Sequence, residues 1–176
     1  LSTSATGLAS VLAQAPQFGL AHLQLAMSLA RLGQANPAMT HMRQARELLA
    51  PLSADVERVM DAMQLSIDPQ SHAETATAFS DLATQYPQNL SYRLEQSRYQ
   101  LHSGDPEAAL ATLSRAAWET QPMGVRIQWL VLLAEIEMAR SNPDAVRQHA
   151  SEAERLARTA GKGWERERAT ALLLKA

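Results

Sequence analysis

The sequence predicts an all-α protein in which four antiparallel helix pairs follow one another, with one further helix at each end. Two observations predict this class. Apolar residues recur every three to four positions along the 176 residues, as on a helix face, and nowhere alternate as in a strand. The eight prolines also form two interleaved series of one period, which indicates an internal repeat.

One proline series marks helix starts. Pro37, Pro69, Pro106 and Pro143 are each preceded by Asn or Asp and lie 32, 37 and 37 residues apart. An Asn or Asp oxygen accepts from the free N–H groups of a first helical turn, and proline lacks the N–H that would go unpaired there. Each pair therefore predicts the corner at which the second helix of a repeat begins.

The other series marks helix stops. Pro16, Pro51, Pro87 and Pro122 each follow an amphipathic run and lie 35, 36 and 35 residues apart. Proline disfavours helix in the residue before it. A period of this length is typical of a helix–turn–helix repeat.

The prolines divide the chain into elements in order. A first helix ends before Pro16, each of the next three repeats spans one start and one stop proline, and the last repeat has a start proline alone, with Gly161 expected to cap it. We expect one array with these elements: a helix over 4–15, repeats over about 18–52, 53–88, 89–122 and 124–160, and a closing helix over 163–176.

Small residues recur at fixed spacing within the repeats. A small residue is followed by glycine after seven positions, by alanine after five more and by another alanine after seven more. The first repeat has Ala26, Gly33, Ala38 and Ala45, and the third has Ser97, Gly104, Ala109 and Ala116. Small side chains let the two helices of a pair approach closely.

The other two repeats depart from this spacing. In the fourth, Trp129 and Ile136 fit the large positions of the first helix, but Arg140 stands where glycine is expected. In the second, Gln70 and Thr75 occupy the glycine and alanine positions.

This pattern resembles the tetratricopeptide (TPR) repeat over most of the chain. Segments such as 19-GLAHLQLAMSLARLGQ-34 and 126-RIQWLVLLAEIEMARSNPDAV-146 are similar to the TPR portions of bacterial regulators. In those proteins the array follows a winged-helix DNA-binding domain, as in CadC/ToxR-like activators, or a serine/threonine kinase domain. The resemblance implies a right-handed α-solenoid of about four TPR helix pairs, acting as a non-catalytic regulatory module that binds a protein or peptide.

The chain begins without methionine and ends in an apolar helical run, and no winged-helix or kinase motif is present in it. We therefore expect a part of a longer protein, with the effector activity in the rest of it. An alternative is a module that senses a small ligand or self-associates and passes that state to the effector domain.

The resemblance places a partner-binding groove along the first helices of the pairs. Counted from the glycine position of each repeat, the side chains expected to line it are Met27, Arg31, Met60, Gln64, Leu94, Arg98, His102, Leu130, Ala134 and Glu137. Arginine and histidine are suited to hold a partner carboxylate, and methionine and leucine to make adaptable apolar contacts.

Composition narrows the partners further. The net charge of −2 and a pI near 6.2 give no general attraction to nucleic acid. Apolar runs such as 129-WLVLLAEI-136 are too short to span a bilayer. There is no cysteine, which fits both the cytoplasm and a disulfide-free periplasmic protein, so the compartment stays open.

No motif predicts catalysis, a metal or a cofactor. The five histidines are far apart in sequence, without HExxH spacing, and there is neither a GxSxG motif nor a cysteine nucleophile. We expect no enzyme activity. Trp118 and Trp164 are expected either to cover the ends of neighbouring helices or to leave an apolar patch for another domain.

Overall fold

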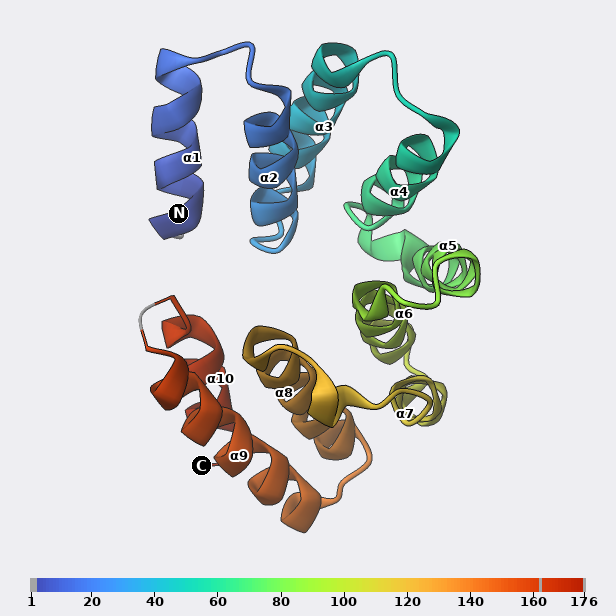
Figure 1. Ribbon diagram of the computed structural model, residues 1–176, viewed down its shortest axis with the longest axis vertical. Coiled ribbons are helices and arrows are strands. Elements are labelled where there is room, and N and C mark those ends of the chain that lie inside the picture. Colours follow the sequence, from blue (N-terminus) through green and yellow to red (C-terminus); the bar gives the residue numbers. More distant parts are fainter. Residues whose placement is uncertain (1–2, 162, 176) are drawn as a thin grey trace. The chain divides into compact units, whose positions relative to one another are not determined.

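The computed structural model describes residues 3–161 and 163–175, and within them it is all-α, with ten α-helices, two short 3₁₀-helices and no strand (Figure 1). This confirms the predicted all-α class and the number of α-helices, while the right-handed solenoid of four helix pairs stays a prediction. In order, the elements are α1 (Thr3–Gln14), α2 (Gly19–Ala30), α3 (Ala35–Leu49), α4 (Ala54–Leu65), η1 (Pro69–Ser71), α5 (His72–Gln85), α6 (Leu90–His102), α7 (Pro106–Leu113), η2 (Trp118–Thr120), α8 (Met123–Ala139), α9 (Pro143–Ala160) and α10 (Glu165–Lys175).

The chain divides into two compact units, Leu1–Thr75 and Ala76–Ala176, with the division inside α5. The single continuous array expected from the sequence stays a prediction. The closing helix was expected over 163–176; α10 covers 165–175 of that span, and residue 176 lies outside the described residues.

In the first unit, α2 and α3 form an antiparallel pair, with α1 packed on α2 and α4 on α3. Alanines at the crossing, among them Ala26 and Ala38, are fully buried. At the far end of the pair, a Cβ on Gly19 would lie 2.8 Å from Cγ of Leu49, so only glycine lets α2 approach α3 this closely. The core of this unit also includes Leu25, Met42 and Met60.

In the second unit, α6 pairs with α7 and α8 with α9, α6 and α7 both contact α8, and α10 packs on α8 and α9. Ser97 and Ala109 meet at the α6–α7 crossing, where the Ser97 hydroxyl donates to the Ala109 carbonyl at 2.8 Å. The apolar core gathers on α8, whose Ile127, Leu132 and Ile136 are fully buried.

Three corners between paired helices share one geometry. Gly33, Gly104 and Ser141 have positive φ angles of 71°, 89° and 59°. In each corner the next N–H donates at 2.9 Å to the carbonyl five residues back, which is the hydrogen bond of a Schellman C-terminal motif. The glycine position of the fourth repeat is therefore Ser141, and its assignment to Arg140 was wrong by one residue.

The helix starts after these corners agree with the prediction in two cases. Asp105 Oδ1 accepts from Ala108 N at 2.9 Å and Asn142 Oδ1 from Ala145 N at 3.4 Å, so each caps a helix that opens with proline. In the first corner, α3 begins earlier and Asn36 lies inside its first turn. The remaining Asn/Asp residue, Asp68, caps the 3₁₀-helix η1 rather than α5. Its Oδ1 accepts a hydrogen bond from the backbone N–H two residues later in the chain.

The stop prolines also need one correction. The helices before Pro16, Pro51 and Pro87 end two residues ahead of them, as expected. The helix before Pro122 ends much earlier, because Trp118 folds back after α7. Its ring is 1% exposed, and its indole N–H donates to the carbonyl of Leu113, the last residue of that helix, at 2.6 Å. This hydrogen bond satisfies a carbonyl that continued helix would have used.

The two tryptophans left open by the sequence are both packed. Trp118 stacks on Trp129 with ring centroids 6.1 Å apart. Trp164 is half-buried and lies against Gly124, where a Cβ would come within 2.6 Å of its ring. Both therefore cover helix ends within the second unit.

Candidate functional site

The corrected corner changes which residues of α8 correspond to those of α6. We count back from the residue with positive φ in each corner. Six positions before it lie Met27, Arg98 and Glu135, in chain order, and two positions before it lie Arg31 in the first corner and His102 in the second. The residues previously counted on α8 were Leu130, Ala134 and Glu137, and all three are buried. For Ala134 and Glu137 the cause is the one-residue error, which turns a helix by about 100° and replaces Glu135 and Met138 by core positions. Leu130 would be buried in either register, because its corrected counterpart, Val131, is buried as well.

The other predicted residues fall into two groups. Met60 and Leu94 are buried core residues. Met27 and Gln64 are half-buried, and Arg31 and His102 are exposed.

Arg98 is the centre of the α6 surface. Its side chain is 28% exposed, and its guanidinium donates to Glu95 at 2.5 Å on the same helix. Burial by itself lowers the pKa of Arg98, but the charges of Glu95 and then Glu135 outweigh it and raise that pKa, so the guanidinium stays charged. Arg98 on α6 and Glu135 on α8 thus each lie six residues before a left-handed corner residue, and the charge of Glu135 acts on Arg98.

Aromatic side chains hold the same part of α6 in place. Tyr99 stacks on Phe79 of α5 with centroids 6.0 Å apart and an interplanar angle of 5°. The ring of His102 meets Tyr99 edge to face at 5.7 Å. These ring contacts restrain the end of α6 next to Arg98.

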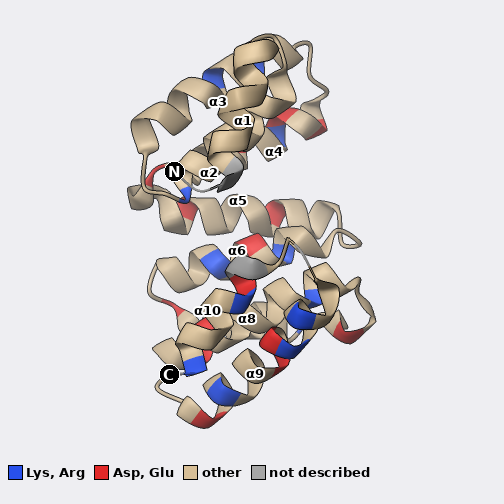
Figure 2. Cartoon of the chain, turned by 90° about the vertical axis from the view of Figure 1, so that its left-hand side faces the viewer, with Lys and Arg blue, Asp and Glu red and all other residues tan. Residues whose placement is uncertain are grey.

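On α8 the stripe that contains Glu135 continues to Met138, three residues on and 50% exposed. We call Arg98, His102, Glu135 and Met138, with Glu95 beside Arg98, the α6–α8 face. It combines a fixed cation, two carboxylates and an exposed thioether. Figure 2 shows Lys and Arg interleaved with Asp and Glu along the helices of this unit.

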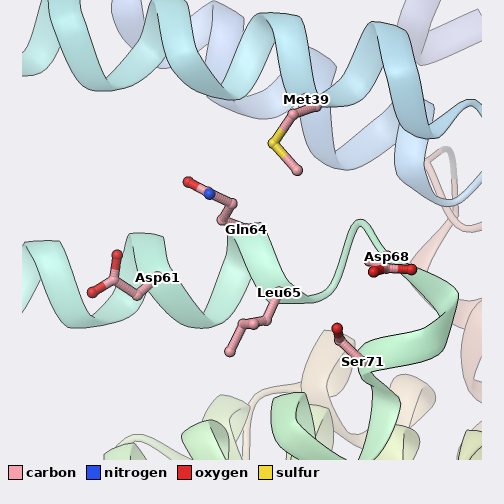
Figure 3. Close-up of a pocket in the computed structure, with 6 residues that line it drawn as sticks. All are labelled: Met39, Asp61, Gln64, Leu65, Asp68 and Ser71. Carbon is pink, nitrogen blue, oxygen red and sulfur yellow. The ribbon is translucent and has the colours of Figure 1, made fainter.

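A hollow of about 420 Å³ lies in the first unit, between Met39 of α3 and the side chains of α4 and η1. Met39 and Gln64 approach from opposite walls (Figure 3). Two carboxylates line it, but Asp61 is paired with Arg46, and Asp68 accepts from the backbone of η1. Both acids already have a structural partner, so the hollow carries no distinct chemistry.

The buried acids of the second unit are likewise engaged. Glu137 accepts from Arg140 at 2.9 Å and from Asn142 Nδ2 at 3.1 Å. Glu154 accepts from Lys175 at 2.8 Å and from Arg158, and these hydrogen bonds, led by that of Lys175, lower the pKa of Glu154. These acids tie helices and corners together. Within the described ranges, no group of three or more His, Asp or Glu side chains is placed to hold a metal ion.

The sequence reading missed one contact. His22 and His41 were expected to be separate, but their Nδ1 atoms lie 2.8 Å apart across the α2–α3 pair. The signal was present, because residues equally distant from a hairpin corner face each other, and this pair lies almost symmetrically outside Ala26 and Ala38.

None of the described helices is both long and apolar enough to cross a membrane. Comparison of the chain with protein-family models, with curated proteins and with solved structures gave no match. Its function has to be inferred from its own residues.

Proposed function

We propose that the chain is a non-catalytic, TPR-like module that binds an extended peptide or a segment of a partner protein. The observation that carries this proposal is the corner repeated at Gly33, Gly104 and Ser141, which sets Arg98 and Glu135 at equivalent positions of neighbouring first helices. In a right-handed stack of such pairs, these positions line the concave surface.

The α6–α8 face has the chemistry for such a ligand. A guanidinium carries five N–H donors, so Arg98 can bind Glu95 and still donate to a carbonyl or carboxylate of a peptide. Met138 of α8 offers an exposed, adaptable apolar contact. Because Glu95 and Tyr99 restrain this end of α6, little side-chain freedom is lost on binding.

The test uses a random peptide library displayed on phage and selected against the full chain. Arg98→Ala is expected to weaken a selected peptide about tenfold or more, since a charge-assisted hydrogen bond contributes roughly 1.5–3 kcal/mol. Met138→Ala removes an apolar contact and is expected to weaken the same peptide as well.

Arg147→Ala is the matched control. Arg147 is an exposed arginine on α9 that is also paired with an acid on its own helix, Asp144. If Arg147→Ala weakens the peptide as much as Arg98→Ala does, or if Arg98→Ala leaves binding unchanged, the assigned face is wrong.

Such modules occur in the regulatory portions of larger proteins. By the resemblance described above, we place this one in a bacterial transcriptional regulator or signalling protein whose effector domain it controls. The partner is a protein or peptide, with no cofactor required.

A second candidate function, self-association, is favoured by α10. Leu172 and Leu173 on this helix are 45% and 77% exposed. Light scattering over a dilution series should show a concentration-dependent mass that Leu172→Ser/Leu173→Ser abolishes. A constant monomer mass in the unmodified chain would remove this candidate and leave peptide binding.

A further inference from the structure

His22 of α2 and His41 of α3 form a hydrogen-bonded pair between these two helices of the first unit. Their Nδ1 atoms are 2.8 Å apart, and their ring centroids 5.1 Å. His22 is 5% exposed, and its other nitrogen, Nε2, lies 3.0 Å from the carbonyl oxygen of Pro16. The two rings therefore connect α2, α3 and the segment between α1 and α2.

The contacts fix the positions of the protons. A carbonyl oxygen only accepts, so Nε2 of His22 carries a hydrogen. In the neutral pair, Nδ1 of His22 is then the bare acceptor, and His41 donates from its own Nδ1. One added proton is tolerated, because a single N–H still lies between the two Nδ1 atoms. A second places an N–H on each, and the hydrogen bond becomes a repulsion between two cations.

The segment that contains α1 and α2 has no carboxylate that could stabilise this second positive charge. Residues 1–30 contain no Asp, Glu, Lys or Arg, and His22 is their only histidine. The pKa of His41 is lowered, first by burial and then by the charge of His22, while a hydrogen bond with Gln44 opposes this.

The helices on the other side also lack a compensating acid. The charged side chains of α3 and α4 are Arg43, Arg46, Glu47, Asp55, Glu57, Arg58 and Asp61. Two of the acids have basic partners, since Asp61 pairs with Arg46 and Asp55 with Arg58. None of this set is among the causes that move the pKa of His41.

We propose that the histidine pair makes the first unit proton-sensitive: near neutral pH it holds α2, α3 and the Pro16 connection together, and acidification loosens them when the pair takes up its second proton. In an unfolded chain both imidazoles are protonated below about pH 6.5. The unfolded state then binds more protons than the folded state, so stability falls as the pH falls.

The first test follows the side-chain nitrogens of the full-length chain by two-dimensional ¹H–¹⁵N NMR between pH 8 and pH 5. Near pH 7.5, His22 is expected as the neutral Nε2–H tautomer, and the pair should titrate in two separate steps, the second below the ordinary histidine range. Independent titration of both rings near pH 6.5 would overturn the proposal. This measurement needs no variant, so it stands even where a substitution prevents folding.

The second test measures amide hydrogen exchange in peptides from residues 1–30, corrected for the intrinsic effect of pH. Protection should fall between pH 7.5 and 5, by about tenfold for each pH unit by which the second step is displaced. His41→Gln, whose amide can still donate to His22 but does not titrate, should lose most of this dependence. His149→Gln in the second unit is the control and should keep it. Equal pH dependence in His41→Gln and the unmodified chain would refute the role of the pair.

Discussion

The corner at Gly33 allows a sharp test, because a single substitution should have opposite effects at two glycines of the same unit. Gly33 has a φ of +71°, and Gly7 lies inside α1; at both, an added Cβ would meet no atom within 4 Å. Gly33→Ala therefore probes the backbone alone. The left-handed conformation costs alanine about 1–2 kcal/mol, and reduced freedom of the unfolded chain returns roughly 0.4–1 kcal/mol, so a net loss of about 1 kcal/mol is expected.

Gly7→Ala should instead stabilise the first unit by about 0.5–1 kcal/mol, because alanine is the better residue inside a helix. Urea unfolding followed by circular dichroism gives both free energies, and the two variants should differ by about 1.5–2 kcal/mol. Two variants with the same sign, or a Gly33→Ala variant as stable as the unmodified chain, would show that this corner does not depend on a left-handed residue.

Three further predictions concern the second unit. Trp118→Phe keeps an aromatic ring but loses the hydrogen bond to the Leu113 carbonyl, and should lower the unfolding free energy by about 1–3 kcal/mol; an unchanged urea midpoint would contradict this. Gly124→Ala should push Trp164 from its place and shift tryptophan fluorescence to the red, and an unshifted spectrum would mean that the ring is not held there. Burial lowers the pKa of His149, so the stability that this residue contributes above about pH 6.5 should be lost as the pH falls below that value. His149→Gln should therefore flatten the pH dependence of the melting temperature. An equally steep dependence in the variant would mean that other groups cause it.

Helix number and most boundaries followed from the sequence, because proline acts on the backbone locally. Pro106 and Pro143 open their helices as expected, and three stop prolines lie two residues beyond a helix end. The end of α7 could not be read in this way, because it depends on Trp118 turning back to the carbonyl of Leu113. That contact is tertiary and leaves no local pattern.

The residues assigned to the candidate site on α8 depended on which residue was taken as the left-handed corner residue, Arg140 or Ser141. A glycine signals a left-handed corner clearly, whereas Ser141 adopts the same conformation without any compositional mark. On α6, His102 is exposed and Arg98 half-buried, whereas Leu94 and the three residues counted on α8 lie in the core. Only the backbone angle identifies Glu135 as the counterpart of Arg98.

The corner at Ser141 is also stabilised by hydrogen bonds between side chains. Glu137 accepts from both Arg140 and Asn142 there, and Arg140 reaches on to Glu107 at 2.8 Å. The other two corners have glycine at the left-handed position, whereas this corner has a serine there and hydrogen bonds among several side chains around it. Ser141→Gly should therefore make the corner more tolerant of Glu137→Gln, and the changes in unfolding free energy of the two single variants, measured by urea unfolding, should not add up to that of the double variant.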